Sequence, residues 1–261
     1  MLKMNFGVMA VSAAVAALTL TTLADAQPRR GAARGENGFA AAAQGQNGGR
    51  YARGGGCLGG QNGQNCGRGG AVMAPNGAAG ARGAGCAEDG AGGVDCARGA
   101  GFIGAEEQVG ARAALLQIQG DGSGEREFGS YYEGEAGHGG RAANLNFDGQ
   151  GNGARQAQLN AEGRNGNFLN SEGNAEWSEE NGMMARRNNQ LAYQGENGGV
   201  QSQGDFGYSR DDGLSADRGT EYSDQNGNSL NVDASYDQDN GYQRDAVCYD
   251  VDGNQITCPG G

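Results

Sequence analysis

The chain has 261 residues, 54 of them glycine, and a net charge of −12 at neutral pH. Within residues 141–261 only 14 of 121 residues are Leu, Ile, Val or Phe, which disfavours a thick apolar core. We therefore expect any folded state to depend on backbone hydrogen bonding, repetition and cross-links. The acidic balance also argues against a nucleic-acid partner, whose phosphates it would repel.

The first 26 residues have the pattern of a secretory signal peptide. Lys3 precedes an almost wholly apolar run at residues 7–20, and Ala24 and Ala26 form an A-x-A cleavage site. The apolar run is shorter than the roughly 18–20 residues that cross a bilayer. We predict cleavage after Ala26, export to the periplasm, cell surface or extracellular space, and no membrane span.

Charge is distributed unevenly along the remaining chain. Residues 27–100 hold eight arginines and four acidic residues, residues 101–200 hold seven and 14, and residues 201–261 hold three and 12. An acidic C-terminal half fits a soluble surface, cation binding, or head-to-tail contact with a basic N-terminal segment.

Residues 27–100 form a low-complexity region rich in Gly, Ala, Asn, Gln and Arg. We expect flexible, irregular backbone there, apart from two disulfide loops. Residues 101–119 are a connecting segment. Its AEEQVGARAALLQ part fits a short helix, which Gly110 weakens, and its ALLQIQ part fits a first strand, which we favour.

Six cysteines in an exported chain predict disulfides. They form three local pairs, each enclosing eight or nine residues with an Asn-Gly or Asp-Gly step that favours a tight reversal. The flanks of the first two loops, ARGGGC…CGRG and ARGAGC…CARG, indicate an internal duplication. Zinc binding is the alternative interpretation of these cysteines, but a zinc site usually requires C-x2-C spacing and histidine. The predicted bonds are Cys57–Cys66, Cys86–Cys96 and Cys248–Cys258.

From about residue 120 onward, turn signals recur at a regular distance. The phrases WSEENG, YQGENG, YSRDDG, YSDQNG and YDQDNG each run from an aromatic residue to a glycine, and those glycines are spaced by 16, 15, 14 and 14 residues. A fixed period indicates a repeat architecture. Residues 120–261 are therefore predicted to form a β-repeat domain.

The segments between these turns alternate in polarity. Residues 229–236 (SLNVDASY) place Leu230, Val232, Ala234 and Tyr236 on one face, as a half-buried strand does, and Asn-Gly between such runs favours a hairpin. The predicted fold class is all-β. It consists of a β-hairpin meander or a β-solenoid in the C-terminal half, preceded by an irregular Gly-rich N-terminal region.

One aromatic residue stands in each repeat, where its ring suits a pleated surface. Stacked repeats would align these rings in a ladder, which serves either as packing of a thin sheet or as a platform for sugar rings. In a disordered chain they would be scattered contact points. The ladder residues are Trp177, Tyr193, Tyr208, Tyr222, Tyr236 and Tyr249.

Two segments resemble known families. Residues 145–158 (LNFDGQGNGARQAQ) resemble the repeats of curli-type amyloid subunits, through Gly149, Gly151, Asn152, Ala154 and Gln158. That resemblance implies a secreted bacterial subunit that polymerises on the cell surface by stacking strand–turn–strand units. Residues 249–257 (YDVDGNQIT) look like a unit of the YD repeats of large surface and toxin-shell proteins, which implies a β-meander.

The sequence offers little for catalysis or for a cofactor. His138 lies among glycines without a partner motif, and no cofactor is expected. Calcium is the only metal with candidates, because carboxylates cluster near glycine turns, although the twelve-residue loop ending in Glu is missing. These weak candidates are Asp237, Asp239, Asp250 and Asp252.

These patterns favour a non-enzymatic, exported structural protein of the bacterial cell surface or extracellular matrix. It would be a fibre subunit or an accessory, amyloid-like or part of a biofilm, whose partners are its own copies or other surface proteins. The alternatives are a monomeric module that binds polysaccharide through the aromatic ladder, and a largely disordered secreted protein.

Overall fold

The computed structural model describes residues 30–35, 37–60, 63–179 and 184–258, and every regular element in these ranges is a β-strand. The expected signal peptide lies outside the described residues.

The chain divides into two units, Met1–Gly134 and Glu135–Gly261. Unit 1 contains β1 (Arg30–Gly35), β2 (Gly38–Gln44), β3 (Arg50–Gly60), β4 (Gly63–Met73), β5 (Ala79–Glu88), β6 (Val94–Ile103), β7 (Val109–Ile118) and β8 (Gly124–Gly134). Unit 2 contains β9 (Gly137–Phe147), β10 (Gly153–Gly163), β11 (Phe168–Ser178), β12 (Met184–Gly195), β13 (Gly198–Ser209), β14 (Gly213–Asp224), β15 (Ser229–Asp237), β16 (Gly241–Tyr249) and β17 (Gln255–Ile256).

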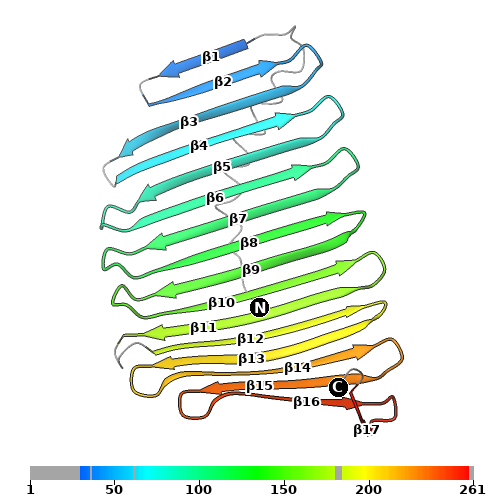
Figure 1. Cartoon of the computed structure of the whole chain (residues 1–261). Coiled ribbons are helices and arrows are strands. Elements are labelled where there is room, and N and C mark those ends of the chain that lie inside the picture. Colours follow the sequence, from blue (N-terminus) through cyan, green and yellow to red (C-terminus); the bar gives the residue numbers. More distant parts are fainter. Residues whose placement is uncertain (1–29, 36, 61–62, 180–183, 259–261) are drawn as a thin grey trace. The chain divides into compact units, whose positions relative to one another are not determined.

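Within each unit, every strand pairs antiparallel with its neighbours in the chain (Figure 1). The all-β prediction is therefore confirmed, and of its two alternatives the structure has the hairpin meander. The segment at residues 145–158 forms the end of β9, a turn and the start of β10.

The predicted irregular N-terminal region is wrong, because β1–β6 occupy most of residues 30–103. Its glycines and alanines carry little side-chain bulk, so neighbouring backbones pair along nine to eleven residues between β3 and β6. Low side-chain complexity therefore marks a strand with small faces here, rather than a flexible linker. The possible helix in residues 105–117 is also absent, because its second half lies in β7.

The reversals explain the spacing of the glycines. In the turn after β10, the N–H of Gly163 donates to the carbonyl of Asn167 (2.7 Å) and the N–H of Gly166 donates to that of Gly163 (3.0 Å). Gly166 has a φ of 77°, which favours glycine. The turn after β14 repeats both bonds around Gly227, which has a φ of 87°.

In the central strands of unit 1 the two sides differ in the size of their side chains. Directly opposed residues on neighbouring strands share a side, and successive residues of a strand alternate between sides. In β5, Arg82, Ala84 and Cys86 lie on one side, which we call the arginine side. Gly83 and Gly85 lie on the other, the small-residue side, where they face glycine and alanine of β6.

The two sides of unit 2 differ in polarity. In β13, Val200, Phe206 and Tyr208 lie on one side, which we call the apolar side, and Gln203 and Asp205 lie on the other, the polar side. The neighbouring strands β14 and β15 continue both sides, with tyrosine and leucine on the first and aspartate on the second.

Neither unit has a conventional core. Among the described residues no large side chain is fully buried, and the buried apolar residues are only Ala52, Ala71, Ala114 and Cys248. Backbone pairing between strands, rather than apolar burial between layers, therefore holds each unit together. Both sides of each sheet are available to a partner.

Candidate functional site: charged bands on the two units

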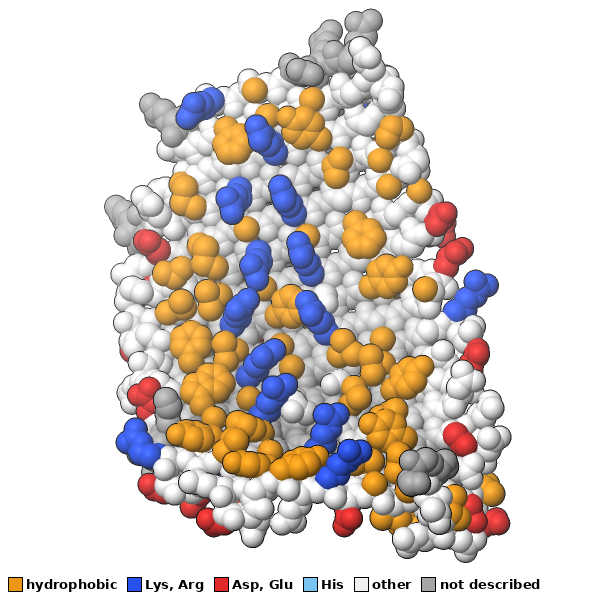
Figure 2. All heavy atoms as spheres, in the orientation of Figure 1, with side chains coloured by type: hydrophobic (Ala, Val, Ile, Leu, Met, Phe, Trp, Pro, Cys, Tyr) orange, Lys and Arg blue, Asp and Glu red, His pale blue; other side chains and the backbone are white. Residues whose placement is uncertain are grey.

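A band of arginines crosses the middle of unit 1 on its arginine side. Arg53 lies opposite Gly70, which lies opposite Arg82, and this row continues through Ala100 to Arg112. All three arginines are exposed. Figure 2 shows the arginine side chains in blue across the middle of these strands, with hydrophobic side chains in orange flanking them.

The neighbouring row has arginines on the intervening strands. Arg68 lies opposite Ala84, which lies opposite Arg98 and then Ala114. Each strand from β3 to β7 therefore contributes one central arginine, and the positions are staggered between two rows. We call Arg53, Arg68, Arg82, Arg98 and Arg112 the arginine band.

Small residues separate these arginines. Gly70, Ala84, Ala100 and Ala114 stand between them, and the surface is hollowed there to a groove of ≈ 530 Å³ whose wall includes Phe128. Because the floor is made of glycine and alanine, the guanidinium groups project above the floor of this groove. They are accessible to an approaching partner.

The arginine band lacks counter-charges. Across the described ranges, none of its five arginines forms an ion pair. Arg53 lies over the ring of Phe39, 5.9 Å from its centroid, a contact that stabilises the cation but leaves its charge in place. Staggered guanidinium groups on adjacent strands repel one another, so an anionic partner would be favoured electrostatically.

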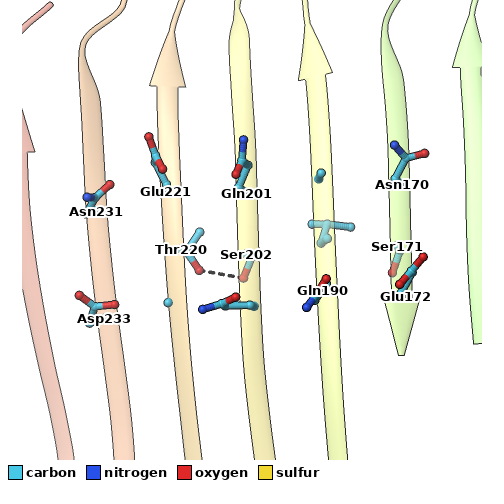
Figure 3. A pocket seen from close by; sticks show the side chains of 14 residues that line it. Asn170, Ser171, Glu172, Gln190, Gln201, Ser202, Thr220, Glu221, Asn231 and Asp233 are labelled. Atoms are coloured by element: carbon cyan, nitrogen blue, oxygen red, sulfur yellow. Dashed lines mark hydrogen bonds between the residues drawn. The ribbon is translucent and has the colours of Figure 1, made fainter. Parts of the chain in front are cut away.

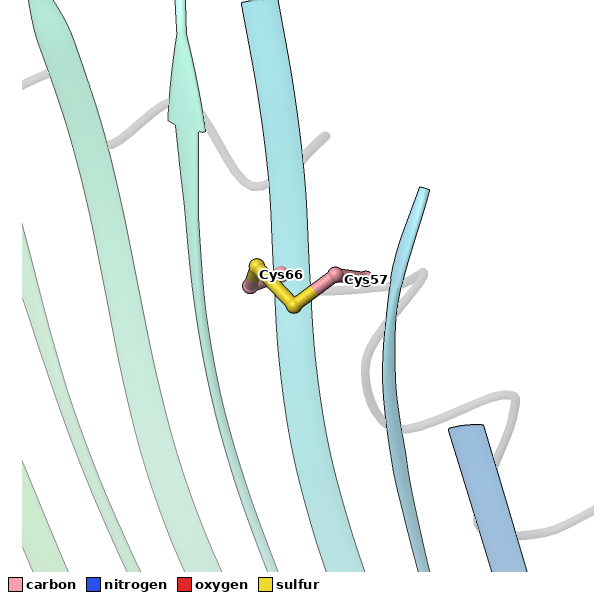
Figure 4. The surroundings of a disulfide bond; sticks show 2 residues. All are labelled: Cys57 and Cys66. Atoms are coloured by element: carbon pink, nitrogen blue, oxygen red, sulfur yellow. A yellow bond between two sulfur atoms is a disulfide. The ribbon is translucent and has the colours of Figure 1, made fainter. Parts of the chain in front are cut away.

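The cysteines of unit 1 form a row beside the arginines. Cys57 lies opposite Cys66, Cys66 opposite Cys86, and Cys86 opposite Cys96. Disulfides join the first and last of these pairs, each across a Cα–Cα distance of 4.0 Å; Figure 4 shows the bond between Cys57 and Cys66. The two bonds fasten β3 to β4 and β5 to β6.

In unit 2 a third disulfide joins Cys248 of β16 to Cys258, with a Cα–Cα distance of 5.2 Å. The predicted local pairing is thus confirmed for all six cysteines. The three pairs are compatible with a protein of an oxidising environment.

The predicted aromatic residues do not form one ladder. Because successive strands run in opposite directions, a ring near the end of each strand falls alternately at the two ends of the strands. Trp177 and Tyr208 flank Ala185 in one row, and Tyr193 and Tyr222 flank a valine of β13 in another.

The last two predicted rings lie elsewhere. Tyr236 occupies a further row of the apolar side, opposite Tyr242. Tyr249 lies on the polar side, opposite Ser229. The structure therefore brings five of the six rings to one side, in separate rows.

The polar side of unit 2 carries a second charged band. Asp205 lies directly opposite Asp217, and Asp233 directly opposite Asp245. Like charges at directly opposed positions destabilise a sheet, so these pairs favour a cationic partner. We call the exposed residues Glu172, Asp205, Asp217, Glu221, Asp233 and Asp245 the acidic band.

Part of the acidic band lines a shallow hollow of ≈ 570 Å³. Figure 3 shows Glu172, Glu221 and Asp233 among amide side chains such as Gln190 and Gln201, on neighbouring strands from β11 to β15. Amides can donate and accept hydrogen bonds, so the hollow combines negative charge with both kinds of polar contact. It suits a flat, hydrogen-bonding partner.

Ser202 and Thr220 lie on the apolar side of these same strands. Their hydroxyl oxygens are 3.0 Å apart, and the Nε of Arg218 donates to the Oγ of Ser202 at 2.9 Å. The hydroxyls thus engage one arginine of unit 2 within its own sheet.

The calcium candidates lie in two different turns. Asp237 and Asp239 stand at the turn between β15 and β16, and Asp250 and Asp252 follow β16 at its other end. The structure does not bring the four carboxylates together.

Each of these turns already uses a carboxylate for its own backbone. The Oδ1 of Asp237 accepts the N–H of Asn240 (2.6 Å), and that of Asp250 accepts the N–H of Asn254 (2.8 Å). These backbone bonds are the main cause of the lowered pKa of both carboxyls.

Nor does any cluster of three or more His, Cys, Asp or Glu suited to a metal occur within the described ranges. His138 lies opposite Glu162, its Nε2 3.7 Å from the carboxylate, on the polar side of unit 2.

The arginine band was missed at the level of sequence, although a signal for it exists. From Arg53 to Arg112 the five arginines are spaced by 15, 14, 16 and 14 residues, the length of one strand and one turn. The period was recognised only through the turns of the C-terminal half. Following one residue type through the N-terminal half would have located the band.

Comparison of the chain with protein-family models, curated proteins and solved structures finds no match. In the part of the chain that the structure describes, no helix is long and apolar enough to span a bilayer.

Proposed function

We propose that this protein is a non-enzymatic, exported structural protein of the bacterial cell surface or extracellular matrix that acts by associating with its own copies. The observation that carries the proposal is the exposure of both sides of the sheet in each unit. A sheet normally buries its apolar side against a second layer. In unit 2, Trp177, Tyr193 and Tyr222 remain 36%, 42% and 46% exposed on the apolar side.

Exposed rings of this kind favour association with another surface. The proposed export is supported by the apolar leader pattern at residues 7–20 and by the three disulfide pairs. Binding is favoured over catalysis because the charged groups lie on broad open surfaces rather than in an enclosed cleft.

The test is sedimentation velocity on oxidised residues 27–261 over a wide range of concentrations, with electron microscopy of the same samples. We expect assemblies that grow with concentration while the far-ultraviolet circular dichroism remains that of β-structure. A folded β-protein that stays monomeric at every concentration would contradict the proposal. A coil spectrum would contradict the fold as well.

Polysaccharide binding is the second candidate, and the aromatic rows of unit 2 favour it. Exposed rings on a flat sheet can stack on the faces of pyranose rings. Trp177 is the only tryptophan of the chain, so its fluorescence reports directly on this side.

The test of this candidate is titration of the folded chain with a soluble polysaccharide, followed by tryptophan emission. A saturable change in emission would support it. Tyr193→Ala and Tyr222→Ala retain the tryptophan reporter, and each should weaken binding if the rings hold the sugar. Emission that does not change at any polysaccharide concentration would count against this candidate.

A further inference from the structure

We propose that copies associate head to tail, with the arginine band of unit 1 of one copy docked on the acidic band of unit 2 of the next. This inference rests on the proposed function, self-association, and names the two surfaces that perform it. The occupant of the arginine band is therefore a second copy of this chain, and the argument for it is charge complementarity.

The arginine band presents five cations without ion pairs among the described residues, on a floor of small side chains. The acidic band presents six carboxylates, four of them in the like-charged pairs Asp205–Asp217 and Asp233–Asp245. Each band is electrostatically unfavourable by itself. Bringing the two together relieves the repulsion in both, and guanidinium–carboxylate pairs can form two parallel hydrogen bonds.

The charges of both bands also recur with the spacing of neighbouring strands. Both lie on antiparallel sheets, in which neighbouring strands are about 4.8 Å apart. Arginines of one row recur on every second strand, with the other row filling the strands between. The carboxylates of Asp205 and Asp217 lie on adjacent strands, as do those of Asp233 and Asp245. A facing sheet can therefore match several charges at once.

Two arginines on the apolar side of unit 2 are less suited to this role. The Nε of Arg187 donates to the Oδ1 of Asn189 (3.0 Å) and that of Arg218 to the Oγ of Ser202 (2.9 Å). Arg187 also lies opposite Phe206, whose ring holds a facing sheet away. By contrast, the residues directly opposite the five arginines of the arginine band are all glycine, alanine or serine.

Two other cations on the polar side of unit 2 lie opposite carboxylates. Arg186 lies opposite Glu176, and His138 lies 3.7 Å from Glu162. Asp205 of the acidic band accepts the side-chain amide of Asn188 (2.8 Å), but among the described residues none of the band's six carboxylates forms an ion pair, so the band keeps its negative charge.

This contact joins different surfaces of two identical copies. Such a heterologous contact propagates, and it produces an open filament unless the rotation between copies closes a ring. It also depends on salt, because exposed charges are screened over about 10 Å at 0.1 M ionic strength. Assembly should therefore weaken as sodium chloride is added.

The experiment uses two charge-reversed forms of oxidised residues 27–261. The first form carries Arg68→Glu, Arg82→Glu and Arg98→Glu, and the second carries Asp217→Arg, Glu221→Arg and Asp233→Arg. Each form alone places like charges on the two bands. We expect the concentration at which half of the protein assembles to rise at least about tenfold.

A 1:1 mixture of the two forms is the decisive sample. The acidic unit 1 of the first form meets the basic unit 2 of the second, and the wild-type unit 1 of the second meets the wild-type unit 2 of the first. We expect the mixture to assemble at about the wild-type concentration, which also proves that both forms are folded. Arg164→Glu with Arg210→Glu, in exposed turns, is the matched control and should leave assembly unchanged.

The outcomes separate the two proposals. If the wild type assembles and the first charge-reversed form does so equally well, the docking inference is wrong while self-association stands. If each form keeps its β circular dichroism, fails alone and does not recover in the mixture, the acidic band is not the partner, and the inference is overturned. A wild type that remains monomeric at low salt overturns both, and binding of a soluble acidic polysaccharide to that monomer would assign the arginine band to a ligand instead.

Discussion

At the residue scale, the glycines with positive φ are the positions at which the backbone conformation disfavours any added side chain. Gly166 has a φ of 77°, and a Cβ added there meets no atom within 4 Å. Any cost of a substitution at this position therefore arises from backbone conformation rather than from crowding.

We expect Gly166→Ala to lower the free energy of unfolding by about 1–2 kcal/mol, because an L-residue is strained in the left-handed region. Gly166→Asn should cost less, since asparagine tolerates that conformation. Urea denaturation measures both. Gly67→Ala in β4 is the control, because its Cβ would lie in ordinary contact with the carbonyl of Ala84 (3.7 Å) and its φ is not positive. Equal effects at the two positions would contradict this account.

The aspartates that begin several turns add a pH dependence. The side-chain amide of Asn228 donates to Asp224 (2.8 Å), and the N–H groups of Asn228 and Asn226 also donate to it. These bonds, the side-chain bond first, lower the pKa of Asp224 below its ordinary value of 3.8.

Because the pKa is lower in the folded state, the stabilisation by Asp224 is complete above the ordinary value and is lost as the pH falls through the lowered one. We expect Asp224→Ala to be less stable than the wild type at about pH 7, and the difference to shrink at about pH 2. Urea denaturation at both pH values measures it. A difference that does not change with pH would show that the charge of Asp224 contributes nothing.

At the scale of elements, each disulfide cross-links the two arms of a single hairpin. The bond between Cys86 and Cys96 closes a loop with a sequence separation of 10 and joins directly opposed positions of β5 and β6. It therefore reinforces a pairing that the backbone already makes.

Replacing both cysteines with alanine should lower the free energy of unfolding by about 2–3 kcal/mol, through the greater entropy of the unfolded chain. Denaturation under oxidising conditions measures the loss. In a reducing buffer the variant and the wild type should differ little, and a large difference there would show that lost packing, not the bond, is responsible.

The sequence predicted individual strands where Asn-Gly or Asp-Gly steps marked the turns between them. Asn-Gly steps and the alternation of apolar and polar residues predicted β15 from SLNVDASY. The cysteine spacing predicted three disulfides between cysteines close in the sequence. The N-terminal strands were missed because alternation there is between arginine or cysteine and glycine or alanine, a pattern that scales of hydrophobicity do not register. The charged bands were missed for a different reason: they depend on cross-strand register, which joins residues such as Arg53 and Arg82 only after the meander is known.

At the scale of the whole molecule, stability is local because each unit consists of neighbouring strand pairs without a shared core. In such arrays each strand is stabilised mainly by its immediate neighbours. β12 pairs along its length with β11 and β13, whereas β17 makes only two residue pairs with β16. Protection of backbone amides should therefore be graded along unit 2 rather than uniform.

We expect the amides of β12 to exchange at least about tenfold more slowly than those of β17, because opening a strand with two partners requires breaking both ladders. Hydrogen exchange followed by mass spectrometry on the oxidised monomer measures this gradient. The same measurement on the double variant Cys248→Ala/Cys258→Ala supplies a control. Loss of this disulfide should accelerate amide exchange at β17 and leave exchange at β12 unchanged. Identical exchange rates across β12–β17 would instead indicate one cooperative unit, in which case contacts beyond the nearest strands must carry much of the stability.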